Sequence, residues 1–188
     1  MLLAAPAIPA ADATDNVGAP VATTPQATPK IDAHVESPAL YAEWGLDPAR
    51  LPYRKDADAR QVFETTRSRA RSEKKLLMVT FGANWCADCR ALHRQLHAEP
   101  VSGFVASHYE IVNVDVGDFD RNLGLAADLG VDLQMGIPVA IFFAADGAVI
   151  GATNHGELEP ARTYTSRQIL RFLEDVAQDG RIAVPSGP

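Results

Sequence analysis

A continuous run of apolar residues at positions 76–81 is the feature that most constrains the fold of this chain. Its β-branched and aromatic members predict a strand buried on both faces, as in sheets that carry helices on each side. Gly82 and the two residues after it break the strand. Residues 86–98 then contain no Gly or Pro, and Leu92 and Leu96 recur four apart on the side that would pack on a sheet, so we expect a helix there. The segment is therefore a strand, a turn and a helix of an α/β fold.

The only two cysteines of the chain, Cys86 and Cys89, lie three residues apart at the start of this helix. The spacing brings both sulfurs to the first helical turn, close enough to form a disulfide that opens and closes reversibly. The helix N-terminus presents unpaired N–H groups and the positive end of the helix dipole, so the pKa of Cys86 should fall below that of a free thiol. We therefore expect Cys86 to be the nucleophile and Cys89, one turn further in, to be the resolving thiol.

Metal binding is the alternative use of such a cysteine pair. A structural zinc ion usually takes four ligands, and His93 and His97 follow on the same helical stripe as Cys89. At about 1.5 Å per residue, however, His97 stands about 12 Å along the helix axis from Cys89, too far to share one ion. We expect no metal site, and we interpret both histidines as solvated residues on the helix face.

The residues around the cysteines resemble the thioredoxin superfamily. The resemblance covers about residues 55–180, and its motifs occur in the order and spacing of that family. The motifs are residues 81–90 around the cysteines, the predicted strand 111–115, and Gly136-Ile137-Pro138 before the apolar strand 139–143. The resemblance implies a thioredoxin-like α/β fold with a central mixed β-sheet flanked by helices on both faces. It also implies that Pro138 follows a cis peptide bond and faces the disulfide, a role that suits a proline just before a strand, where no ladder hydrogen bond is lost.

Thiol–disulfide exchange is the activity that this resemblance implies. Trp85, Ile137 and Pro138 would form an apolar groove that binds the substrate backbone beside the disulfide. The finer resemblance is to the C-terminal thioredoxin-like domain of the membrane-bound thiol:disulfide interchange reductases of bacterial envelopes. There, too, a basic residue follows the second cysteine, as Arg90 does here, and an acid-Pro segment such as Glu99-Pro100 comes later.

This finer resemblance implies a reductase of protein disulfides with no cofactor other than its own redox-active disulfide. Its partners would be disulfide-containing proteins and a membrane electron donor, and its location would be the periplasm or the exterior, with the cytoplasm as the alternative. The sequence leaves the direction of exchange open. An oxidase or isomerase would run the same reaction the other way, and a metal-binding module would use the cysteines as ligands.

Two positions depart from the family pattern. Many thioredoxins carry a buried aspartate six residues before the first cysteine and a lysine on the neighbouring strand, whereas this chain has Thr80 and Ile111. Because both charges are missing, neither is left buried without its partner. The proton of the resolving thiol must then go elsewhere, and Asp88 is the nearest carboxylate by sequence; an exposed first-turn residue favoured by the helix dipole is the other interpretation of Asp88. We interpret Arg90 as a surface residue that adds positive potential near the thiols.

The sequence divides into a leader, an arm, a domain and a tail. Residues 1–38 are rich in Ala, Pro and Thr and cannot bury enough apolar surface to fold alone, so we expect a disordered leader. Its first residues resemble the remnant of a secretory signal without the basic region. Residues 39–54 are aromatic enough to pack on the domain as an N-terminal arm. We expect the thioredoxin-like domain at 55–180 and a flexible tail at 181–188.

Four further elements are predicted by local patterns. They are a helix at 58–73 with Val62 and Phe63 facing inward, a short helix at 120–129 closed by Gly130, a hairpin turn at Asp146-Gly147 between strands 139–143 and 148–152, and a capping box at Thr165 and Gln168 that opens a final helix. The stretch 155–164 is longer than a link from hairpin to helix requires, and it is long enough to border the active site.

Charge and hydropathy exclude two other classes of protein. The net charge is −7, from 17 basic and 24 acidic residues, and no basic face typical of nucleic-acid binding is present. No apolar run approaches the roughly 20 residues that a membrane-spanning helix requires. We therefore expect neither a nucleic-acid partner nor a transmembrane segment.

Overall fold

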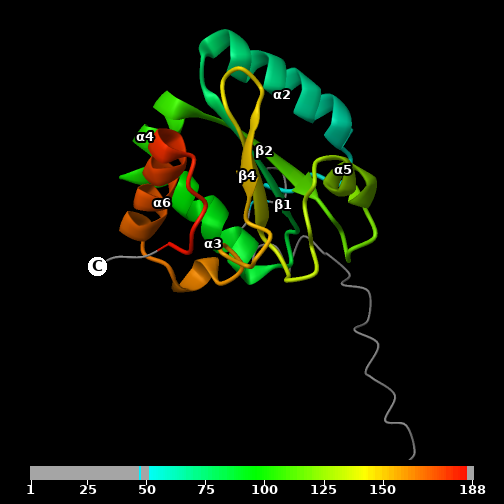
Figure 1. Cartoon of the computed structure of the whole chain (residues 1–188). Coiled ribbons are helices and arrows are strands. Elements are labelled where there is room, and N and C mark those ends of the chain that lie inside the picture. The colour runs from blue at the N-terminus through cyan, green and yellow to red at the C-terminus, as the bar shows by residue number, and fades with distance from the viewer. Residues whose placement is uncertain (1–46, 48–50, 186–188) are drawn as a thin grey trace, which may run out of the picture. The chain divides into compact units, whose positions relative to one another are not determined.

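The computed structural model describes residue 47 and residues 51–185 (Figure 1). The predictions for the leader, most of the arm and the last residues of the tail lie outside this part of the chain. In chain order, the elements are α2 (Ala59–Glu73), β1 (Leu76–Gly82), α3 (Ala87–Leu96), α4 (Val101–His108), β2 (Tyr109–Asp115), α5 (Leu123–Asp128), β3 (Val139–Phe143), β4 (Val149–Ala152), the 3-10 helix η2 (Ala161–Thr163) and α6 (Ser166–Asp179).

The described strands form one mixed sheet with the order β2-β1-β3-β4. β2 runs parallel to β1, with Gly82 opposite Asp115, whereas β3 runs antiparallel to β1 and β4 antiparallel to β3. The start of β3 therefore lies beside the end of β1, because Val139 pairs with Phe81. This pairing places the segment before β3 next to the C-terminal end of β1, where the chain leaves the sheet and enters α3. The predicted hairpin of β3 and β4 is confirmed, with Gly147 at a φ of 92°.

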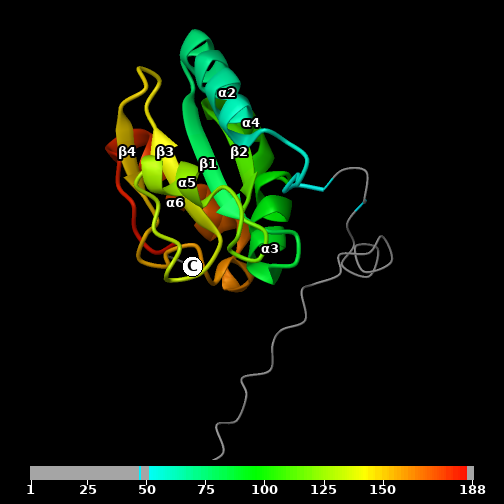
Figure 2. The same cartoon turned by 90° about the vertical axis from the view of Figure 1, so that its right-hand side faces the viewer.

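Helices cover both faces of the sheet, which confirms the predicted fold class. Figure 2 shows α2 and α5 in front of the sheet and α6 behind it. One buried cluster joins α2 and α5 to the sheet through Phe63 and Leu125, and it also contains both cysteines. A second cluster joins α3, α4 and α6 to the other face, with Leu92 and Leu96 among its members. Burying each of these large apolar side chains contributes about 1.5–3 kcal/mol.

Helix α2 matches its predicted position but not both of its predicted inward residues. Asp58 is its N-cap and accepts a hydrogen bond from the Gln61 amide at 3.0 Å. Phe63 is 2% exposed, whereas Val62 is 40% exposed, so the prediction for Val62 was wrong. The buried stripe runs through Phe63, Thr66 and Ala70, and the residue before Phe63 is turned about 100° away from it.

The short helix after β2 begins later than predicted. α5 starts at Leu123 because Phe119 and Asn122 have φ values of 61° and 52°, which an α-helix does not allow. Residues 116–122 therefore form a loop. The predicted capping box is confirmed: the Thr165 side chain accepts from the Gln168 amide, and Gln168 accepts from the Thr165 amide. None of the helices in the described part of the chain has the length and apolar character needed to cross a membrane.

Candidate active site

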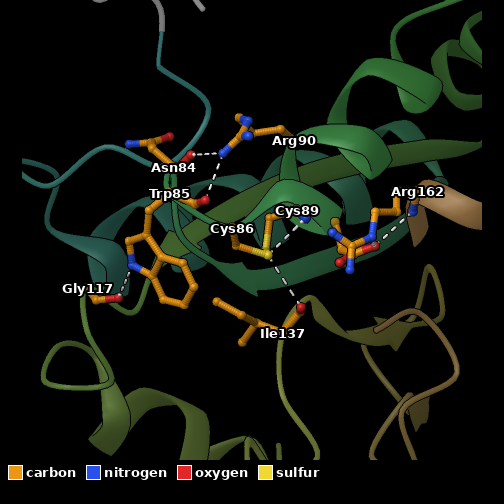
Figure 3. Close-up of a disulfide and its surroundings, with 9 residues drawn as sticks. Asn84, Trp85, Cys86, Cys89, Arg90, Gly117, Ile137 and Arg162 are labelled. Carbon is orange, nitrogen blue, oxygen red and sulfur yellow. Dashed lines mark hydrogen bonds and ion pairs between the residues drawn. A yellow bond between two sulfur atoms is a disulfide. The ribbon is translucent and has the colours of Figure 1, made fainter. Parts of the chain in front are cut away.

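The two cysteines form a disulfide at the N-terminus of α3 (Figure 3). Cys86 is the N-cap, with a non-helical φ of −70° and ψ of 118°, and its Cα lies 5.2 Å from that of Cys89 in the first turn. Cys86 is 6% exposed and Cys89 is fully buried. The helix start therefore presents Cys86 as the outer sulfur and keeps Cys89 inside the core.

The Cys86 sulfur has two polar neighbours, one hydrogen-bond donor and one hydrogen-bond acceptor. The Cys89 amide donates a hydrogen bond to it at 3.0 Å, and the Ile137 carbonyl oxygen lies 3.4 Å away. In the disulfide the sulfur carries no proton, so the carbonyl contact becomes a hydrogen bond only when Cys86 is reduced to a thiol. The amide and the helix dipole favour the thiolate, whereas the carbonyl favours the thiol.

The loop before β3 supplies the opposite side of the site. The Ile137–Pro138 peptide bond is cis, as the family resemblance implies, and both residues are buried. Trp85 directly precedes Cys86 and is half-buried. Its indole Nε1 donates to the Gly117 carbonyl oxygen at 3.0 Å, and its ring centroid lies 6.2 Å from that of Phe119. The structure thus places Ile137 beside the Cys86 sulfur, with Trp85 directly before Cys86 and Pro138 directly after Ile137; Phe119, which packs on Trp85, was missed by sequence reasoning.

Asn84 ties the active-site turn to the N-terminal arm. It is fully buried, and its side chain accepts from the Tyr53 amide at 3.2 Å and donates to the Tyr53 carbonyl at 2.7 Å. Tyr53 is only 1% exposed, so the described end of the arm packs on the domain. The aromatic residues at 39–54 signalled such packing, but nothing in the sequence indicated that Asn84 is its partner.

Arg90, predicted as a surface residue that adds positive potential, lies along the active-site turn and binds its backbone. Its Nη1 donates to the carbonyl oxygens of Asn84 and Trp85, at 3.0 and 2.7 Å, and the side chain is half-buried (Figure 3). Burial and the charge of Arg94 lower the pKa of Arg90. A guanidinium nevertheless stays charged in proteins, so Arg90 holds the turn before the disulfide with a permanent cation.

Asp88 is 8% exposed, and therefore its interpretation as an exposed first-turn residue was wrong. Its Oδ1 accepts a hydrogen bond from the Arg162 amide at 2.9 Å, and Arg162 Nε lies 3.6 Å from the same oxygen. Gln95 also fastens this segment to α3 by donating to the Ala161 and Tyr164 carbonyls, at 3.3 and 2.8 Å. The stretch 155–164 thus borders the site through η2. Its length was the only sequence signal for this contact.

The two positions that depart from the family pattern are uncharged and lie within the sheet. Thr80 is 1% exposed, and its Oγ1 has no hydrogen-bond partner among the described residues. Ile111 pairs with Met78 on β1 and is half-buried. No buried charge is therefore left without its partner at these two positions.

His93 in the last turn of α3 and His97, its C-cap, pack against each other. Their rings lie 4.1 Å apart, and no group of three or more His, Cys, Asp or Glu side chains suited to a metal occurs in the residues that the structure describes. His93 is half-buried rather than solvated, which corrects its prediction, whereas His97 is exposed. Burial, helped by His97 and Arg94, lowers the pKa of His93 to about 4.

Comparison with known proteins finds similarity to thioredoxin-like proteins in both sequence and structure. A sequence profile of thioredoxin-like proteins matches residues 58–145. The chain is similar to the crystal structure of a disulphide isomerase from Xylella fastidiosa Temecula1, with 37% identity and a TM-score of 0.66 over 69% of this chain and 98% of the other. A thioredoxin from Thermus thermophilus is 20% identical, with a TM-score of 0.48 over 63% of this chain and 85% of the other. No curated protein sequence matches the chain.

Proposed function

The chain belongs to the thioredoxin superfamily, and we propose that it is a thiol–disulfide oxidoreductase that reduces protein disulfides through Cys86 and Cys89. One observation carries the proposal: the disulfide lies at the N-terminus of α3, with its outer sulfur beside the Ile137 carbonyl and the Pro138 loop. A structural disulfide that only closed a four-residue segment would restrict the unfolded chain little.

In the proposed reaction, the reduced protein attacks with the Cys86 thiolate. A bond forms between Cys86 and one substrate sulfur, while the other substrate sulfur leaves as a thiolate and takes up a proton. The Cys89 thiolate then attacks the Cys86 sulfur, which forms the Cys86–Cys89 disulfide and releases the second substrate thiol. The protein supplies two electrons; of the two protons that the substrate thiols take up, one balances the proton that Cys89 gives up before it attacks and the other comes from solvent. A dithiol donor must then return two electrons to the protein.

The exposures of the two sulfurs support this order of events. A substrate reaches Cys86, which is 6% exposed, but not the fully buried Cys89. In our proposal, Trp85, Ile137 and Pro138 bind the substrate backbone on either side of Cys86. Asp88 and Arg90 adjust the charge around the sulfurs rather than touching the substrate, because Asp88 is bound by Arg162 and Arg90 by two backbone carbonyls.

Reduction is the direction we propose, in the periplasm or outside the cell, with a membrane protein as electron donor. It rests on the resemblance to the domain linked to envelope reductases and on the negative charge of Asp88, which disfavours a neighbouring thiolate. A less stabilised thiolate makes the reduced form a stronger reductant. Isomerisation is the second candidate, because the relative at 37% identity is a disulphide isomerase.

The reduction potential measured against glutathione tests the direction. We expect a value nearer that of thioredoxin, about −270 mV, than the about −120 mV of the strong periplasmic oxidant. A value above about −180 mV, in the range of the isomerases, would refute the reductase and favour the second candidate. Cys86→Ser and Cys89→Ser are the matched controls, because each removes the couple. A wild-type protein without any redox couple would refute both candidates and favour metal binding.

A further inference from the structure

Phe119 is an exposed aromatic residue next to Trp85, and the proposed exchange reaction leaves it without a role. Phe119 is 41% exposed, and its ring lies against that of Trp85, which precedes Cys86. Single exposed apolar residues are common on protein surfaces. Phe119 differs from these because its ring packs on that of Trp85, the residue immediately before the reactive Cys86.

The backbone at Phe119 is held in an unfavourable conformation. Its φ of 61° lies in the left-handed region, which an aromatic residue rarely adopts because its Cβ crowds the backbone. Burial does not compensate for this strain, since much of the ring remains exposed to solvent. Strain of this kind persists where the surrounding structure enforces it, and it occurs often at binding sites.

Buried contacts enforce the loop at 116–122. Asp115, at the end of β2, is 2% exposed; its Oδ2 pairs with Arg121 Nη1 at 3.1 Å, and its carbonyl accepts from Asn122 Nδ2 at 2.7 Å. At the start of the loop, the Gly117 carbonyl oxygen accepts a hydrogen bond from the Trp85 indole at 3.0 Å. Both ends of the loop are therefore fixed, one to the sheet and one to the residue before Cys86.

From these contacts we propose that Phe119 is a specificity-determining residue, which binds an apolar side chain next to the cysteine of a protein substrate. Asp118 and Asp120 flank Phe119 and are exposed, and Arg121 Nε lies 4.0 Å from Asp120 Oδ1. The exposed loop thus carries two acidic residues against one basic residue, and a basic residue beside that apolar side chain complements its surface. The substrate class is thus an extended segment with the order cysteine, apolar residue, basic residue. This inference rests on the proposed function and adds a substrate preference to it.

Two synthetic peptides with an intramolecular disulfide test the preference. They differ only in the residue after one cysteine, Leu in one and Ser in the other, and both carry Lys at the next position. The pre-reduced protein is mixed with excess peptide, and its oxidation is followed by acid quenching and mass spectrometry. Glutathione disulfide is the third oxidant, because it offers no side chain for Phe119. We expect the wild-type protein to react about fivefold faster with the Leu peptide than with the Ser peptide, the effect of one partly exposed apolar contact.

Phe119→Ala should lower the ratio of the Leu-peptide rate to the Ser-peptide rate to about one and leave the rate with glutathione disulfide unchanged. Phe119→Leu should keep most of the preference for the Leu peptide. Val149→Ala is the matched control. Val149 is 61% exposed, and it pairs with Phe143 at the end of the sheet away from the disulfide, so the ratio should stay as in the wild type.

A ratio that survives Phe119→Ala would overturn the inference. So would an equal loss of rate with all three oxidants, because Phe119 would then act only by placing Trp85. A wild-type protein that none of the three oxidises would overturn the proposed function, and the substrate preference with it.

Discussion

Tyr53 and Gly82 offer a test of how the N-terminal arm holds the active-site strand. A Cβ added at Gly82 would lie 2.6 Å from Cζ and 2.7 Å from Oη of Tyr53. Both distances are well below a van der Waals contact, so Gly82→Ala must displace the tyrosine ring. Overpacking of this kind costs about 1–3 kcal/mol.

Tyr53→Ala removes the ring instead of displacing it. Because Tyr53 is 1% exposed, the expected loss is about 3–5 kcal/mol, as for other buried aromatic residues replaced by alanine. An unfolding entropy of about 2.1 cal/mol/K per residue over roughly 130 residues gives about 0.27 kcal/mol/K. The melting temperature should therefore fall by about 11–18 °C for Tyr53→Ala and by about 4–11 °C for Gly82→Ala.

The double variant makes this prediction specific to the contact between the two residues. Without the tyrosine ring, the alanine at position 82 meets no obstacle from Tyr53, so Gly82→Ala should add less than about 0.5 kcal/mol. Calorimetry of the oxidised proteins measures the melting temperatures of the wild type, the two single variants and the double variant. Val62→Ala is the control: Val62 is 40% exposed, so its melting temperature should change little. Additive effects, or a shift below about 3 °C for Tyr53→Ala, would refute the packing of the arm on β1.

Four other outcomes are expected. Alkylation of the reduced protein at mildly acidic pH should modify Cys86 before Cys89, and mass spectrometric labelling of Cys89 first would reverse their roles. Asp88→Asn should lower the pKa of Cys86 and make the protein more oxidising, which thiolate absorbance and the reduction potential measure; an unchanged pKa would remove Asp88 from the tuning of the site. A chain that starts at Ser37 should keep full disulfide-reducing activity, and a marked loss would show that the leader contributes to the domain. Because the pKa of His93 is lowered to about 4, stability should fall as the pH drops from about 6.5 towards 4, and His93→Gln should flatten this part of the pH profile in denaturant titrations.

Local patterns predicted most of the fold. The strand at 76–81, the capping box at Thr165 and the hairpin at Gly147 each depend on neighbours within a few residues, and each is present in the structure. One error was the start of α5, because nothing in the sequence signals the positive φ values of Phe119 and Asn122. The other arose where one residue had to be placed on a particular side of a helix. Val62 and Phe63 are both apolar, and only the packing of α2 on the sheet shows which of them is buried.

The site was less predictable because its supporting contacts join distant segments. Tyr53 bonds Asn84 across 31 positions, the Gly117 carbonyl bonds Trp85 across 32, and Arg162 bonds Asp88 across 74. A single sequence carries no pattern for such pairs. The cysteine spacing identified the chemistry, but not the residues that fix its geometry.

Three separate segments therefore hold three residues of the turn that carries the disulfide. The arm holds Asn84, the loop at 116–122 holds Trp85, and the stretch at 155–164 holds Asp88. The reduction potential depends on how strongly the folded site stabilises the reduced pair relative to the disulfide, and about 30 mV corresponds to about 1.4 kcal/mol. Of these contacts, the one from the Arg162 amide to Asp88 involves a charged group, and such a hydrogen bond contributes about 1.5–3 kcal/mol. Its loss changes the potential to the extent that the bond stabilises the reduced and the disulfide forms unequally. The potential of this site therefore depends on the arm, the loop at 116–122 and the stretch at 155–164 as well as on the two cysteines.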